Sequence, residues 1–156
     1  MKKSDFILVY KKLKMDIQNL NLCLKDLKLK DINEKIKNLK FALKEFQNIY
    51  NKNEDIQEDV MDIIEDFYEC KADFKEDVLD LKMDIAELKM DLKELYLEYE
   101  DYENDEDIQE DINDIKEEIA DIKEEIQSIK EEYEQEILDI EDEIDEIMEN
   151  IENLKN

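Results

Sequence analysis

The sequence predicts an all-α protein: three long antiparallel helices in an up-down-up coiled-coil bundle, forming one domain over residues 1–156. Its 156 residues include no glycine and no proline, where average usage would supply roughly 19. Because tight turns and helix stops depend on those two residues, we expect few turns and long elements. Charged residues make up 46% and hydrophobic residues 42%, a balance typical of helical bundles rather than disordered chains.

The first predicted helix covers about residues 4–51. From Phe6 to Leu27 its apolar residues recur at alternating steps of three and four, which is the core spacing of a heptad repeat. The pattern slips near Asp31 and continues from Ile32 to Tyr50. Two interpretations stay open: a break near residues 28–31, with Asp31 starting a new helix, or a slipped turn within one helix.

The second and third predicted helices cover about residues 54–103 and 106–155. Both keep the heptad spacing, and each contains one stutter, at residues 70–78 and 133–137, where two steps of four follow each other. Both begin with the same segment, Asp-Ile-Gln-Glu-Asp. In each copy an Asp is followed three residues later by Glu, which resembles a capping box, so we expect Asp55 and Asp107 to be N-caps.

The antiparallel arrangement is predicted from register, because residues that face each other in a hairpin have a constant index sum. Phe6 then faces Tyr99, with a sum of 105, and Phe74 faces Ile137, with a sum of 211. With these sums the slip near residue 31 and the two stutters fall at one height, as an up-down-up bundle requires. The alternative is an extended parallel coiled-coil dimer, although the heptad phase is lost across the second join.

The net charge of −27, from 22 basic and 49 acidic residues, argues against direct binding of nucleic acid or anionic membranes. The apolar run Phe6–Tyr10 is too short for a signal peptide or a membrane span. Cys23 and Cys70 do not make a disulfide framework. We therefore expect a cytoplasmic protein, in the host cytoplasm if the chain is viral.

The sequence lacks the residues on which most enzyme chemistry depends. Without histidine, arginine or glycine, it cannot build the usual acid–base pairs, zinc sites, phosphate loops or calcium loops. Cys70 occupies a core position, where a cysteine commonly serves as a small apolar residue. The sequence therefore predicts no enzyme, no catalytic residue, no metal and no cofactor.

Charge is distributed unevenly: residues 1–52 have a net charge of +7, residues 53–103 of −15 and residues 104–156 of −19. A basic first helix that docks on two acidic helices explains the asymmetry. It does not explain the excess of negative charge. The two acidic helices together carry roughly one net negative charge per 2.2 Å of axis, which approaches the one charge per about 1.7 Å of duplex DNA. The predicted acidic face consists of Asp80, Asp84, Glu87, Asp91, Glu94, Glu98, Asp114, Glu117, Asp121, Glu124, Glu131, Asp139, Asp142, Asp145, Glu146 and Glu149. The alternative is that these acids only keep the protein solvated.

A second apolar row runs along the first and second predicted helices, opposite their core positions. Its members are Leu8, Met15 and Leu22 on the first helix and Met83, Met90 and Leu97 on the second, at steps of seven. We interpret them as a seam for self-association or for docking of a partner, because long exposed apolar rows are otherwise unfavourable. The alternative is that both faces turn inward around a wider core.

These surfaces predict a non-enzymatic binding protein that competes with nucleic acid for a basic groove on a partner protein. In charge and size alone the chain resembles acidic nucleic-acid mimics, including the anti-restriction and anti-CRISPR inhibitors of phages. No family motif supports that resemblance, and no residue can be assigned from it. The alternative function is a structural coiled-coil scaffold or spacer that acts by oligomerisation.

Overall fold

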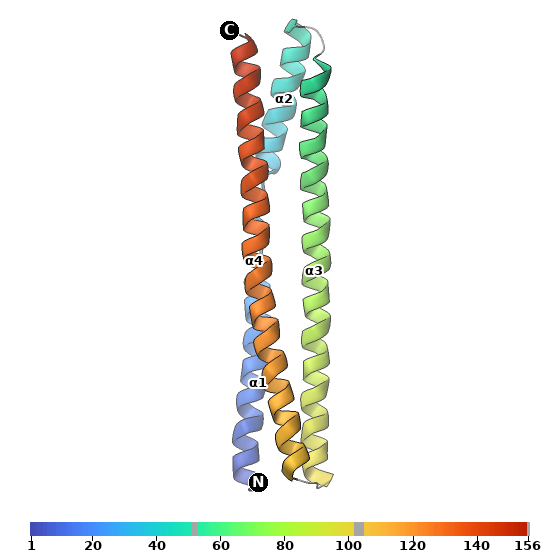
Figure 1. Cartoon of the computed structure of the whole chain (residues 1–156), viewed down its shortest axis with the longest axis vertical. Helices are drawn as coiled ribbons and strands as arrows, with labels where there is room; N and C mark the ends of the chain where they lie inside the picture. The colour runs from blue at the N-terminus through green and yellow to red at the C-terminus, as the bar shows by residue number, and fades with distance from the viewer. Residues whose placement is uncertain (51–52, 102–104, 156) are drawn as a thin grey trace. The chain divides into compact units, whose positions relative to one another are not determined.

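The computed structural model describes residues 1–50, 53–101 and 105–155, which form four helices and no strand (Figure 1). The helices are α1 (Lys3–Asp26), α2 (Asn33–Tyr50), α3 (Glu54–Asp101) and α4 (Asp105–Lys155). The all-α prediction is confirmed. The prediction of three helices is wrong, because the first of them is divided into α1 and α2. The expected helix ends at residues 51 and 103 lie outside the described residues.

The break between α1 and α2 covers residues 27–32 and falls where the heptad pattern slips. Leu27 and Ile32, five residues apart, are both buried. A continuous α-helix would point two such residues in different directions, so a non-helical segment lets both reach the core. Asp31 lies just before α2, and its Oδ1 accepts a hydrogen bond from the Asn33 backbone N–H at 2.9 Å. This bond satisfies one of the free donors at the start of the helix.

The N-cap of α3 is Asn53, whose Oδ1 accepts a hydrogen bond from the Ile56 backbone N–H at 3.1 Å. The prediction that Asp55 and Asp107 are N-caps is wrong, because both lie within the first turn of their helices, α3 and α4. Asparagine is as good an N-cap as aspartate, so the earlier residue begins the helix. The displaced aspartates still interact favourably with the positive end of the helix dipole.

The chain divides into two compact units, and each is described by itself. Unit 1 contains Met1–Lys28 and Glu76–Lys130, and unit 2 contains Leu29–Lys75 and Glu131–Asn156. The division points in the sequence lie at or close to the slip and the two stutters of the heptad pattern. The irregular spacing therefore falls close to the sequence positions that separate the two units.

Unit 1 packs α1 against the second half of α3 and the first half of α4 (Figure 1). The Phe6 ring stacks on the Tyr99 ring with centroids 3.9 Å apart, which is the pair predicted by the index sum of 105. The Met1 amino group is 2.6 Å from Asp105 Oδ2 at the start of α4. In unit 1, α1 therefore runs antiparallel to α3 and parallel to α4.

Unit 2 packs α2 against the first half of α3 and the second half of α4. Phe74 of α3 meets Tyr133 of α4 edge to face, with centroids 5.2 Å apart and an angle of 80° between the rings. Tyr133 lies one helical turn before Ile137, the partner expected from register. Glu141 of α4 is 8% exposed and is 3.0 Å from the Lys30 ammonium and 3.3 Å from that of Lys35. These hydrogen bonds outweigh the opposing effect of burial and lower the pKa of the Glu141 carboxyl.

Candidate binding surfaces

The most acidic feature of unit 1 is the groove between α3 and α4. A hollow of about 190 Å³ in this groove has Leu95 and Ile115 at its apolar base. Its other lining residues are all acidic: Asp91, Glu94 and Glu98 of α3, and Asp111, Asp114 and Glu118 of α4. Like charges therefore meet at a position where coiled coils usually place ion pairs.

The acidic groove extends beyond this hollow because the heptad repeat places acids on both facing flanks. On each helix, the flank consists of the two positions per heptad that lie next to the core residues on the side of the other helix. Between residues 80 and 98 of α3 and residues 107 and 125 of α4, all twelve of these positions are acidic. They are Asp80, Asp84, Glu87, Asp91, Glu94 and Glu98, with Asp107, Asp111, Asp114, Glu118, Asp121 and Glu125. We call these twelve residues the acidic groove.

The pKa of Glu118 reflects this crowding. Partial burial raises the pKa of its carboxyl above the ordinary value of 4.5, and the negative charges of neighbours such as Asp91 and Glu87 raise it further. Unit 2 has an equivalent pair of flanks. There, burial and the charge of Asp66 raise the pKa of Glu143. In both units the facing flanks of α3 and α4 thus repel each other.

The sixteen acids predicted from the sequence are divided between the two units, so their positions are described within each unit. Fifteen are exposed and Asp91 is partly buried, but ten belong to unit 1 and six to unit 2. Asp145 lies 3.3 Å from the Lys35 ammonium, so its charge is partly balanced inside the protein. Sequence reasoning missed four residues of the acidic groove, all on α4: Asp107, Asp111, Glu118 and Glu125. The index sum of about 209 that places Asp111 and Glu118 opposite Glu98 and Asp91 could have identified these two.

The opposite flank of α3, which faces α1, is basic. Tyr96 marks this side, because its ring packs 6.2 Å from that of Phe6 and 5.1 Å from that of Tyr10. Lys89 lies seven residues before Tyr96 and therefore on the same flank of α3. Lys14 lies on the same flank of α1 as Ile7, seven residues earlier, which borders the same hollow as Tyr96. The lysines of these two flanks are Lys11, Lys14 and Lys25 of α1 and Lys82, Lys89 and Lys93 of α3, and all are exposed. We call these six residues the lysine face.

The lysine face is bordered by the two apolar rows predicted from the sequence, which we call the apolar ridges. The six side chains are between 57% and 68% exposed: Leu8, Met15 and Leu22 of α1, and Met83, Met90 and Leu97 of α3. They do not turn inward, so the alternative of a wider core is wrong for these residues. Sequence reasoning identified the ridges but did not identify the lysines between them.

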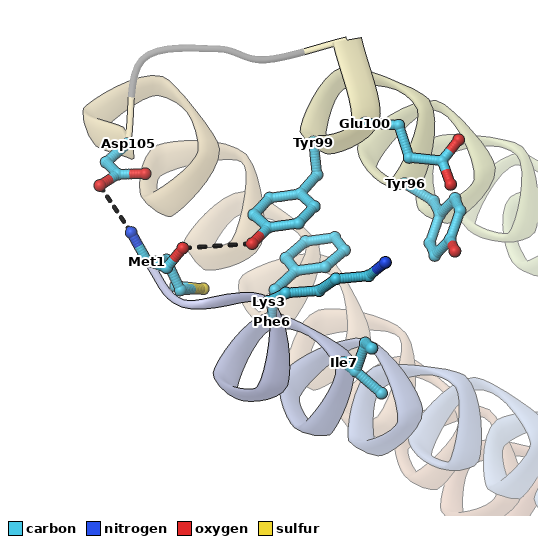
Figure 2. A pocket seen from close by; sticks show the side chains of 8 residues that line it. All are labelled: Met1, Lys3, Phe6, Ile7, Tyr96, Tyr99, Glu100 and Asp105. Atoms are coloured by element: carbon cyan, nitrogen blue, oxygen red, sulfur yellow. Dashed lines mark hydrogen bonds and ion pairs between the residues drawn. The ribbon is translucent and has the colours of Figure 1, made fainter.

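A third feature of unit 1 is a hollow of about 420 Å³ beside the start of α1 (Figure 2). In Figure 2 the Tyr99 hydroxyl donates a hydrogen bond to the Met1 backbone oxygen at 3.1 Å, and the Phe6 ring lies against Tyr99. The Glu100 carboxylate raises the pKa of the neighbouring Tyr96 hydroxyl. These contacts connect α1 with the end of α3 and the start of α4.

The two cysteines have different surroundings. Cys23 is exposed, and it lines shallow hollows between α1 and α4. Cys70 is buried, and burial together with the nearby Glu136 carboxylate raises the pKa of its thiol to about 12. Cys70 is therefore protonated at neutral pH and is a poor nucleophile.

Within residues 1–50, 53–101 and 105–155, no group of three or more Cys, Asp or Glu side chains has the arrangement of a metal site. None of the helices in the described part of the chain contains an apolar stretch of the length and hydropathy that crossing a membrane requires. No protein-family model matches this chain, and no curated protein or solved structure matches it at a significant level. Any functional assignment therefore depends on the surfaces themselves.

Proposed function

We propose that this chain is a non-enzymatic acidic binding protein that blocks a basic, nucleic-acid-binding groove on a partner protein. The observation that carries the proposal is the acidic groove: six carboxylates of α3 and α4 line one hollow, and the heptad repeat places six more on the same two flanks. Lysine and arginine side chains of a partner would fit this arrangement through charge-assisted hydrogen bonds.

The charge density supports the comparison with nucleic acid. In unit 1, residues 76–101 of α3 and 105–130 of α4 contain 21 acids and six lysines. Each segment is about 39 Å long at 1.5 Å per residue, which gives roughly one net negative charge per 2.6 Å. Duplex DNA carries one per about 1.7 Å. A groove that attracts a nucleic-acid backbone would therefore attract this surface too, with association that salt weakens.

The acidic groove is also unfavourable for folding, which is a reason to look for its use in binding. Lysines on one of the two flanks would turn the repulsion into ion pairs, as in many coiled coils. Local features that oppose stability are commonly found at functional sites. The raised pKa of Glu118 supports this argument.

The proposal includes the up-down-up arrangement of the whole chain, with α1 and α2 together as its first arm. Contacts within each unit support it. Asp91 influences Glu118 in unit 1, and Asp66 influences Glu143 in unit 2, and both pairs have an index sum of 209. A single antiparallel register of α3 and α4 therefore accounts for both units.

The alternative function, a coiled-coil scaffold that acts by oligomerisation, is favoured by the exposure of the apolar ridges. The two functions use different residues. A scaffold would keep its assembly when the acidic groove is altered, whereas a nucleic-acid mimic would lose its partner.

The test is a pulldown from nuclease-treated lysate of the native source or host, with the chain immobilised. We expect it to retain basic proteins at about 50 mM salt and to release them at about 500 mM salt or when duplex DNA is added. The double variant Glu94→Lys with Asp114→Lys should lose this capture. The control Glu58→Lys with Glu65→Lys changes the net charge equally at exposed positions outside the groove and should retain it. Absence of any basic protein at low salt would refute the proposal.

A further inference from the structure

Helix α3 in unit 1 carries opposite charges on its two flanks. Its α4 side contributes acids such as Asp91 and Glu94 to the acidic groove, and its α1 side contributes Lys82 and Lys89 to the lysine face. The ridge residue Met90 lies between these flanks. One molecule therefore presents an anionic channel and a cationic surface side by side.

The lysines of the lysine face form no direct ion pair with an acid of the described residues. The ammonium groups that form ion pairs in the described part of the chain belong to Met1, Lys12, Lys30, Lys35 and Lys155, and none belongs to the lysine face. In a chain of net charge −27, six exposed and unpaired lysines bordered by apolar ridges indicate an anionic occupant.

The acidic groove of a second copy matches this surface in charge and in repeat. Lys82 and Lys89 are seven residues apart, and so are the groove residues Asp107, Asp114 and Asp121. Seven residues of helix correspond to about 10.5 Å, or two turns, so lysines and acids can pair at every second turn of two docked helices. Both surfaces also border the ridge of α3, which can bury apolar area against a ridge of the second copy.

We propose that the lysine face of one copy binds the acidic groove of a second copy. The two surfaces differ, so the contact is heterologous and can extend head to tail. A two-fold symmetric dimer would form this contact twice, with each lysine face against the acidic groove of the other copy. The proposal rests on the acidic groove of the proposed function and adds a regulation to it. A groove covered by another copy cannot hold a basic partner, so self-association and capture compete.

The first experiment is sedimentation velocity of the wild-type chain over a concentration series. We expect species larger than the monomer at about 20 mM salt and monomer at about 500 mM salt, because the contact is electrostatic. A monomer at every concentration in low salt would overturn the proposal. So would association that persists or increases in high salt, because the apolar ridges would then bind each other.

Two variants test the heterologous contact by complementation. The first, Lys14→Glu with Lys89→Glu, removes the lysine face and keeps the groove. The second, Glu94→Lys with Asp114→Lys, does the reverse. Each variant alone should be monomeric, with circular dichroism confirming its helices, and an equimolar mixture should form a dimer that cannot extend. A mixture that stays monomeric contradicts the proposal.

The control Lys37→Glu with Lys40→Glu reverses the same charge at exposed positions of α2 and should associate as the wild type does. Equal loss of association in this control would show a general charge effect and overturn the assignment. Co-sedimentation of wild-type monomer with phosphatidylserine vesicles, lost only in Lys14→Glu with Lys89→Glu, would assign the lysine face to lipid instead. The same variant keeps the acidic groove, so its failure to capture a basic partner would count against the proposed function alone.

Discussion

Replacing Glu118 with glutamine should make the protein more stable, although it removes a charge from the surface. Glu118 lines the acidic groove beside Asp91 and Asp114. Burial and these neighbouring charges raise the pKa of its carboxyl, which means that the ionised form is disfavoured in the folded state. Glutamine keeps the shape and the helix propensity of the side chain and removes the repulsion.

The size of the effect follows from the number of neighbours. The charges of four acids on α3 and α4 act on Glu118. A single like-charge pair at an exposed site costs about 0.2–0.5 kcal/mol, and solvent screens the more distant pairs. We therefore expect Glu118→Gln to raise the free energy of unfolding by about 0.5–1.5 kcal/mol. For a protein of this length, that corresponds to an increase in Tm of roughly 1–6 °C.

The assay is urea unfolding followed by circular dichroism at low salt and neutral pH. Glu117→Gln is the matched control, because Glu117 is the adjacent exposed glutamate and lies outside the acidic groove. The gain of Glu118→Gln over this control should shrink as salt is added. If Glu118→Gln is no more stable than Glu117→Gln, or if the difference does not depend on salt, then the repulsion inferred for the groove is absent.

Three further predictions follow from the titrating and buried groups. Stability should be highest near pH 4.5–5. As the pH falls from 7 to about 4.5, stability should rise, because the folded state takes up protons at Glu118 and Glu143, whose pKa values are raised. At lower pH stability should fall, because the contribution of Glu141, whose pKa is lowered, is lost; urea midpoints across this range test both signs. Glu141→Gln should lower the free energy of unfolding by about 1 kcal/mol in the same assay, because hydrogen bonds from the exposed Lys30 and the partly exposed Lys35 lose their charged acceptor. A colorimetric thiol reagent should modify Cys23 in the folded protein and Cys70 only in denaturant; rapid reaction of both would contradict the burial of Cys70.

The heptad pattern predicted the core of the protein well, because periodic burial is a local property of a helix. Every residue of the predicted core row from Ile108 to Tyr133 is buried except Ile119, which is partly exposed. The stacked pair Phe6 and Tyr99 also followed from register. The break in the first helix was harder to decide, since a slip in spacing is equally compatible with a bent helix. What decides it is that Leu27 and Ile32 are both buried, and that is a property of tertiary packing.

The binding surfaces were less predictable, because the sequence does not show which neighbour each flank of a helix faces. Helices in the same order can be arranged around the bundle axis clockwise or anticlockwise. The opposite handedness exchanges the neighbours that the two flanks of each helix face. The acids of α3 would then face α1, and its lysines, such as Lys89, would face the lysines of α4, such as Lys123. In the structure the acidic flanks of α3 and α4 face each other across the hollow lined by Asp91 and Glu118. The acidic groove and the lysine face therefore both depend on the hand of unit 1, and they arise together.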